Sequence, residues 1–146
     1  MSEDRPVIMI VDDDEMNLEM AQAILEARVN AEFLQVTSGR QCLHILKLRR
    51  GKVDLLLLDV AMPSMDGLET LEKIREQRGW EKIPVIMLTA SADKGTIIKA
   101  SRLGIHDYVR KPFEPEDLVA RVKKELAIKQ LDSPELQDVF RMLDKL

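Results

Sequence analysis

Three aspartates follow two runs of apolar residues, in an order that places carboxylates together. Asp12 and Asp13 come directly after Val7–Val11, and Asp59 comes directly after Leu55–Leu58. A buried parallel strand is a continuous apolar run, because helices cover both of its faces. Ligands and reacting groups of such sheets lie just outside the carboxyl ends of the strands. The three carboxylates are therefore predicted to meet at one edge of a parallel sheet.

Two further apolar runs lead to residues that can bind an anion. Val85–Leu88 is followed by Thr89, and Tyr108–Val109 leads within two residues to Lys111. A threonine or a lysine taken alone is most simply an ordinary strand or surface residue. Their joint placement with the aspartates, at four strand ends, favours a common site.

Clustered carboxylates repel one another and raise each other's pKa values, so the site needs a cation. A hard divalent ion such as Mg²⁺ prefers oxygen ligands and is bound through one or two carboxylates and several waters. Such an ion also stabilises the oxygens of a phosphoryl group in transfer. A carboxylate can act as the nucleophile and form an acyl phosphate. The residues thus favour Mg²⁺-dependent phosphoryl transfer, in which Lys111 and Thr89 hold the phosphoryl oxygens.

The elements that position these residues alternate between strand and helix patterns. This alternation predicts an α/β fold, a doubly wound, five-stranded parallel sheet with an extra C-terminal helix. Strands are expected at 7–11, 32–37, 55–59, 85–89 and 108–109. Helices are expected to begin at Asp14, Ser38, Asp66, Asp93, Pro115 and Asp132, and Gly79 is expected to end the third of them.

Residues 1–130 are expected to form one domain, and 131–146 an amphipathic helix that this domain does not need. Its apolar residues share one face, as expected for a helix that packs against something. The helix is either folded back on the domain, or in contact with a partner, a second copy or a following domain, as a linker or a dimerisation segment. The residues of this face are Leu136, Val139, Phe140 and Leu143.

The bulk properties limit the class of protein. The chain has 146 residues and a net charge of −4, which suits one domain and argues against nucleic-acid binding by this segment. Its one cysteine, Cys42, allows no internal disulfide and fits a reducing compartment. The sequence shows no signal peptide and no apolar run of roughly 20 residues that could span a membrane. We expect a cytoplasmic protein without membrane contact.

The combined motifs resemble the receiver domain of two-component response regulators. The resemblance covers about Val7 to Ile128 and implies a flavodoxin-like (βα)₅ fold. Its residues are Val11-Asp12-Asp13, Asp59 with Met62-Pro63 and Asp66-Gly67, Thr89-Ala90, and Asp107-Tyr108 with Lys111-Pro112-Phe113.

The resemblance implies a specific chemistry at this site. Asp59 would accept a phosphoryl group from a sensor histidine kinase or a histidine phosphotransfer protein. Mg²⁺ would be bound by Asp13, Asp59 and the backbone carbonyl of Ala61, with Asp12 helping through water. Apart from this self-phosphotransfer and autodephosphorylation, no enzymatic activity is expected.

The resemblance also implies a switch. Thr89, followed by Ala90, would move toward the new phosphoryl charge, and the ring of Tyr108 would turn inward. The surface of the fourth helix, fifth strand and fifth helix would change shape, as a shift between two packings. The Lys111–Pro112 peptide bond would be cis. Ala61 and Ser91 are too small to block or orient water strongly, so the lifetime of the phosphoryl group is not predicted.

Two other readings stay open. The chain could be a receiver-like interaction module that is never phosphorylated. It could also be a phosphatase of the haloacid-dehalogenase type, with an Asp-x-Asp-x-Thr/Val pattern after the first strand. The sequence has Met16 where this pattern needs Thr or Val, and the late acidic pair is missing, which disfavours the phosphatase.

Overall fold

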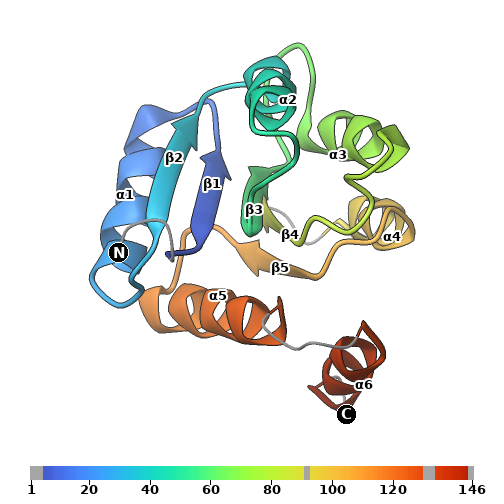
Figure 1. Cartoon of the computed structure of the whole chain (residues 1–146). Coiled ribbons are helices and arrows are strands. Elements are labelled where there is room, and N and C mark those ends of the chain that lie inside the picture. The colour runs from blue at the N-terminus through green and yellow to red at the C-terminus, as the bar shows by residue number, and fades with distance from the viewer. Residues whose placement is uncertain (1–4, 91–92, 130–133, 145–146) are drawn as a thin grey trace.

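The computed structural model describes residues 5–90, 93–129 and 134–144. Its five strands form one parallel sheet in the order β2-β1-β3-β4-β5 (Figure 1). The strands are β1 (Val7–Val11), β2 (Glu32–Val36), β3 (Leu55–Asp59), β4 (Val85–Thr89) and β5 (Asp107–Arg110). The predicted fold class, a doubly wound parallel sheet with an extra C-terminal helix, is confirmed.

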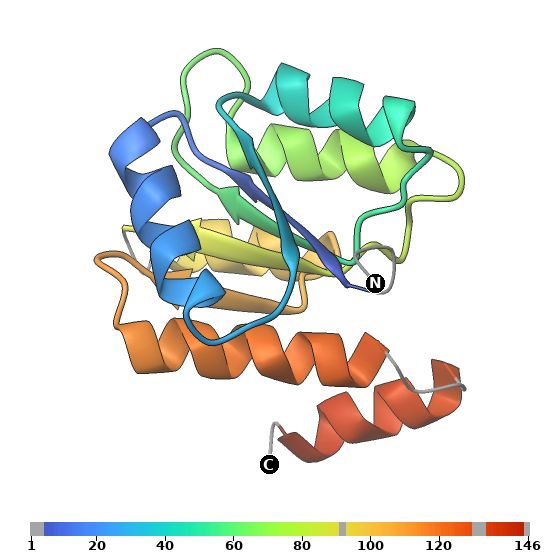
Figure 2. The same cartoon turned by 60° about the vertical axis from the view of Figure 1, so that its left-hand side comes forward.

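Helices cover both faces of the sheet (Figures 1 and 2). Alternate strand residues point to opposite faces, so Ile8 and Ile10 pack with α1 and α5, whereas Met9 and Val11 pack with α2, α3 and α4. The strands β1, β3 and β4 are buried along their whole length, which explains their uninterrupted apolar runs. The helices are α1 (Glu15–Glu26), α2 (Gly39–Leu48), α3 (Gly67–Glu76), α4 (Lys94–Arg102), α5 (Pro115–Lys129) and α6 (Pro134–Asp144).

The predicted starts of the first five helices are confirmed. The side chains of Asp14, Ser38, Asp66 and Asp93 each accept a hydrogen bond from a backbone N–H in the first turn of the following helix. Pro115 begins α5, where its missing N–H has no intrahelical partner to lose. These caps fix where each chain segment turns from a strand end into a helix, and so fix the loops that carry the site.

The predicted end of the third helix is wrong. This helix ends at Glu76, before Gly79, because Gln77 is already extended, with φ −81° and ψ 124°. Gly79 lies in the turn that follows, with φ +93°. The guanidinium of Arg75 holds this turn by donating hydrogen bonds to the carbonyls of Trp80 and Ile83, at 3.2 and 2.9 Å.

The C-terminal helix α6 folds back against α5 (Figure 2). Of the alternatives that the sequence leaves open, this contact with the domain is therefore present. The predicted boundary at 130/131 and the predicted start at Asp132 lie outside the described residues. Within the described part of the chain, no helix is both long and apolar enough to cross a membrane.

Candidate functional site

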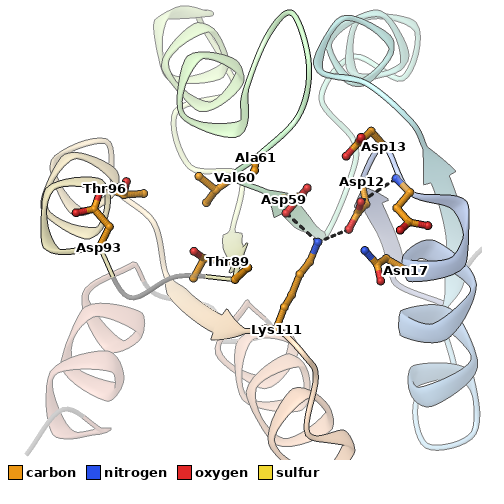
Figure 3. Close-up of a pocket in the computed structure, with 12 residues that line it drawn as sticks. Asp12, Asp13, Asn17, Asp59, Val60, Ala61, Thr89, Asp93, Thr96 and Lys111 are labelled. Atoms are coloured by element: carbon orange, nitrogen blue, oxygen red, sulfur yellow. Dashed lines mark hydrogen bonds and ion pairs between the residues drawn. The ribbon is translucent and has the colours of Figure 1, made fainter.

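The carboxyl ends of β1, β3, β4 and β5 surround an open cavity of about 490 Å³ (Figure 3). The strand ends supply carboxylates, a hydroxyl and an ammonium to this cavity, and the first turns of α1 and α4 add Asn17 and Thr96 to its lining. Its lining residues are Asp12, Asp13, Asp14, Asn17, Asp59, Val60, Ala61, Thr89, Ala90, Asp93, Thr96 and Lys111.

The ammonium of Lys111 joins two of the strand ends. Its Nζ donates hydrogen bonds to Asp12 Oδ2 at 2.6 Å and to Asp59 Oδ1 at 2.9 Å (Figure 3). Asp12 and Asp59 are 1% and 4% exposed, so these are charge-assisted bonds largely shielded from water. The Lys111–Pro112 peptide bond is cis, as predicted, and the Lys111 backbone N–H donates to the carbonyl of Thr89 at 2.7 Å.

The charges of the site are not balanced. Three carboxylates, those of Asp12, Asp13 and Asp59, face the ammonium of Lys111, which is the one cation among the described residues that line the cavity. Burial raises the pKa of Asp59, Lys111 opposes this rise, and Asp12 and Asp13 add to it. Burial lowers the pKa of Lys111, but its bonds to Asp12 and Asp59 outweigh burial and leave this pKa raised. The site therefore holds an excess of negative charge in a cavity that opens to solvent.

The donor set fits a hard divalent cation. One carboxylate oxygen from each of Asp12, Asp13 and Asp59 lies within 4.8 Å of the others. Asp13 is exposed, which leaves room on that side for the waters that Mg²⁺ retains. Asp14 is not part of this group, because its side chain caps α1 at the backbone N–H of Met16, at 2.9 Å.

The structure brings nearly all the predicted site residues together. Thr89 is 6% exposed at the end of β4, and Ala61 and Ala90 line the cavity as exposed residues. Tyr108 does not line it. This ring is 39% exposed and borders a separate cavity of about 290 Å³ beside α5. Ser91 lies outside the described residues.

Sequence reasoning missed two contributors to the site. Asn17 lines the cavity from the first turn of α1; a signal was available, because a helix that follows a strand end begins at the same edge of the sheet. Gly67 was named in the motif Asp66-Gly67, but without the contact that makes a glycine necessary there. A Cβ atom built there would lie 2.1 Å from the carbonyl oxygen of Asp59, so only glycine lets α3 begin against the strand end that carries Asp59.

Comparisons with known proteins agree with this geometry. Residues 8–123 match the family model of the response regulator receiver domain. The chain is 36% identical over 126 residues to the hybrid signal transduction histidine kinase D of Dictyostelium discoideum. It is 34% identical over 127 residues to the alkaline phosphatase synthesis transcriptional regulatory protein PhoP of Bacillus subtilis. These matches take in 86% and 87% of this chain, but only 8% and 51% of the two relatives' lengths.

A solved structure is similar over nearly its whole length. It is the receiver domain protein (CheY-like) from Methanospirillum hungatei JF-1, with a TM-score of 0.76 and 29% identity. The match covers 86% of this chain and 97% of that one. Helix α6 begins at Pro134, after the last residue of the family match.

Proposed function

This chain belongs to the family of response regulator receiver domains of two-component signalling, and from that premise we propose that Asp59 is its phosphoryl acceptor. The observation that carries the proposal is the group of three carboxylates around one lysine at the strand ends. The donor would be a phosphohistidine on a sensor histidine kinase or a histidine phosphotransfer protein. A carboxylate oxygen of Asp59 attacks phosphorus, the P–N bond breaks, and the donor histidine leaves as imidazole.

We assign metal binding and phosphoryl binding to the other residues of the cavity. Asp12, Asp13, Asp59 and the carbonyl of Ala61 would hold Mg²⁺. When bound, the ion neutralises the carboxylates and the oxygens of the phosphoryl group. Lys111, which is already held at Asp59, would bind a phosphoryl oxygen on the acyl phosphate. The product stays on the chain, so the proposal is a receiver of a signal and not an enzyme that turns over a substrate.

A change at Asp59 can reach the surface through β4 and β5. Thr89 and Ala90 end β4 at the cavity, and Thr89 pairs in the sheet with Arg110 of β5. We propose that Thr89 moves toward the phosphoryl group and that Tyr108, now partly exposed beside α5, turns inward. The surface of α4, β5 and α5 would then differ between the two states, which is how a partner could read them.

The test is the intact mass of the chain after incubation with acetyl phosphate, with Mg²⁺ or with a chelator. We expect a Mg²⁺-dependent gain of one phosphoryl group that Asp59→Asn abolishes. The matched control is Asp14→Asn, which changes an acid of the same cavity outside the carboxylate group, and asparagine caps a helix as well as aspartate does. This control should still be phosphorylated.

Other outcomes would point elsewhere. No gain of mass under any condition would favour an interaction module that is never phosphorylated. Phosphorylation of the Asp59→Asn variant would place the acceptor at another residue. Repeated release of phosphate from an added phosphate ester would favour the phosphatase.

A further inference from the structure

The two ends of helix α4 are held in different ways. Its first half, residues 94–98, adds nothing to either hydrophobic core cluster found among the described residues, and Ile98 is 51% exposed. Its second half contains Ala100, which is 2% exposed in the core, and Leu103 packs against the same cluster directly after the helix. Segments with few buried apolar contacts open most easily, so burial stabilises the end of α4 more than its beginning.

The end of α4 is also clamped to α3 by one side chain. The guanidinium of Arg75, in the last turn of α3, donates hydrogen bonds to the carbonyls of Leu103 and Gly104, at 2.8 and 2.9 Å. The same guanidinium donates to the carbonyls of Trp80 and Ile83, in the loop before β4. The carbonyls at a helix C-terminus lack intrahelical partners, and a charged donor binds them more strongly than a neutral one. Arg75 thus ties the end of α4 to two other segments of the chain.

The beginning of α4 lies at the cavity and contains a weak helix former. Asp93 and Thr96 both line the cavity that holds Asp59, and Thr96 Oγ1 donates to Asp93 Oδ2 at 2.8 Å (Figure 3). Gly95 follows the cap, and glycine weakens a helix because it loses more backbone freedom than alanine on folding. Its surroundings do not require a glycine, since a Cβ atom built there would come no closer than 3.8 Å to the Asp93 carboxylate.

We propose that α4 is a two-part helix, in which residues 94–98 open locally while Arg75 keeps the C-terminal end fixed on α3. The half that opens is the half at the cavity, so a charge added at Asp59 acts mainly on it, because electrostatic interactions weaken with distance. The part of α4 that a partner can read is then residues 94–98, where Ile98 is exposed. This second step rests on the proposed function of Asp59, whereas the local opening does not.

Amide hydrogen exchange of the unphosphorylated chain tests the local opening. The amide of Ile97 donates to the carbonyl of Asp93, and that of Leu103 donates to the carbonyl of Ala100. We expect the protection factor of Ile97 to be at least roughly tenfold lower than that of Leu103. Equal protection of the two amides would overturn the two-part helix.

A substitution in each half of α4 sharpens this test. Gly95→Ala should slow exchange at Ile97 by about threefold, because alanine favours the helix in the half that opens. Ser101→Ala is the matched control, since it also raises helix propensity but changes an exposed residue of the clamped half. This control should leave exchange at Ile97 unchanged. A Gly95→Ala variant that exchanges like the parent chain would overturn the local opening.

Removing the clamp should let the opening spread to the end of α4. Arg75→Met should speed exchange at Leu103 roughly tenfold or more, because the C-terminal carbonyls lose their charged donor. Arg75→Lys, which keeps the charge, should also speed it, because a single ammonium cannot reproduce the planar fork that reaches four carbonyls. The lysine variant carries the test if the methionine variant does not fold. Arg78→Met changes an exposed arginine three residues later and should leave Leu103 unchanged. Unchanged exchange at Leu103 in both Arg75 variants would overturn the clamp.

Exchange after incubation with acetyl phosphate and Mg²⁺ tests the link to the site, and intact mass shows whether the chain is phosphorylated. Phosphorylation should change exchange at Ile97 by roughly threefold or more and leave Leu103 unchanged, whereas in Arg75→Met it should change both. If Arg75 only stabilised the fold, its loss would speed exchange at Leu103 equally with and without the phosphoryl group. No gain of mass would overturn the proposed function and leave the two-part helix standing. A gain of mass with equal changes at Ile97 and Leu103 in the parent chain would overturn the two-part helix instead.

Discussion

Two groups of buried charges lie near opposite ends of the strands, and they differ in how well their positive and negative charges are matched. At the carboxyl edge, Asp12 and Asp59 share the ammonium of Lys111, with Asp13 beside them. At the other edge, Glu125 on α5 meets Arg141 on α6. Asp59 and Glu125 are 4% and 1% exposed, and burial raises the pKa of both. Depth of burial and the presence of an ion pair therefore do not tell the two groups apart.

The difference is in what each group still lacks. The first has three carboxylates for one cation, at the base of a cavity open to solvent. In the second, the Glu125 carboxylate is bonded to the guanidinium of Arg141, with one further cation, Lys124, and one further acid, Asp107, acting on it, and the group is covered by the helix that this pair holds in place. A matched buried pair is a structural contact, since each charge already has its counterpart. An unmatched group in a cavity calls for a ligand, and this property identifies the functional site.

The largest effect should follow from removing the cation of the unmatched group. Lys111→Met leaves the carboxylates of Asp12 and Asp59 without their ammonium, on strand ends that cannot move away. Loss of one partner of a buried pair costs roughly 3–5 kcal/mol, and because this site opens to water we expect a loss of about 3 kcal/mol. Urea unfolding in a chelator should show this loss, and added Mg²⁺ should restore part of it. An unchanged free energy of unfolding would mean that Lys111 does not neutralise the site.

Removing the cation of the matched group should lower the free energy of unfolding by less. Arg141→Leu leaves Glu125 unpaired, but α6 can lift off α5 and expose this carboxylate to water. We expect a loss of about 1 kcal/mol in the free energy of unfolding, together with faster amide hydrogen exchange in α6. Mg²⁺ should not restore the loss, because one carboxylate does not form a metal site. A loss as large as that of Lys111→Met, or a rescue by Mg²⁺, would erase the distinction between the two groups.

Whether the sequence alone predicts each charged group depends on how far apart in the sequence the residues that form it lie. The carboxyl edge was predictable because apolar runs and caps are local signals, and a parallel sheet brings its strand ends together. Glu125 was not recognised as buried, because a charged residue within an amphipathic helix looks like part of a solvated face. Its burial depends on Arg141, sixteen residues away, and on the return of α6.

The smallest effect concerns the carboxylates themselves and their dependence on pH. Burial raises the pKa of both Asp59 and Glu125, so between the unfolded and the folded pKa the folded chain binds more protons than the unfolded chain. Each group therefore makes the fold less stable as pH rises through that window, which begins near the unperturbed values of about 3.9 and 4.3.

Asp59→Asn and Glu125→Gln remove these titrations while keeping an oxygen that can accept the bond from Lys111 or Arg141. In a chelator at pH 7.5, we expect Asp59→Asn to stabilise the chain by about 1 kcal/mol, after allowance for screening by water. Glu125→Gln should stabilise it by less, because one acid among the described residues, Asp107, adds to the rise in the pKa of Glu125, whereas two, Asp12 and Asp13, add to that of Asp59. Both differences from the parent chain should shrink as pH falls and the parent carboxylates take up protons. Equal increases in the free energy of unfolding for the two variants would show that burial alone, and not the excess of negative charge around it, makes the ionised Asp59 destabilising.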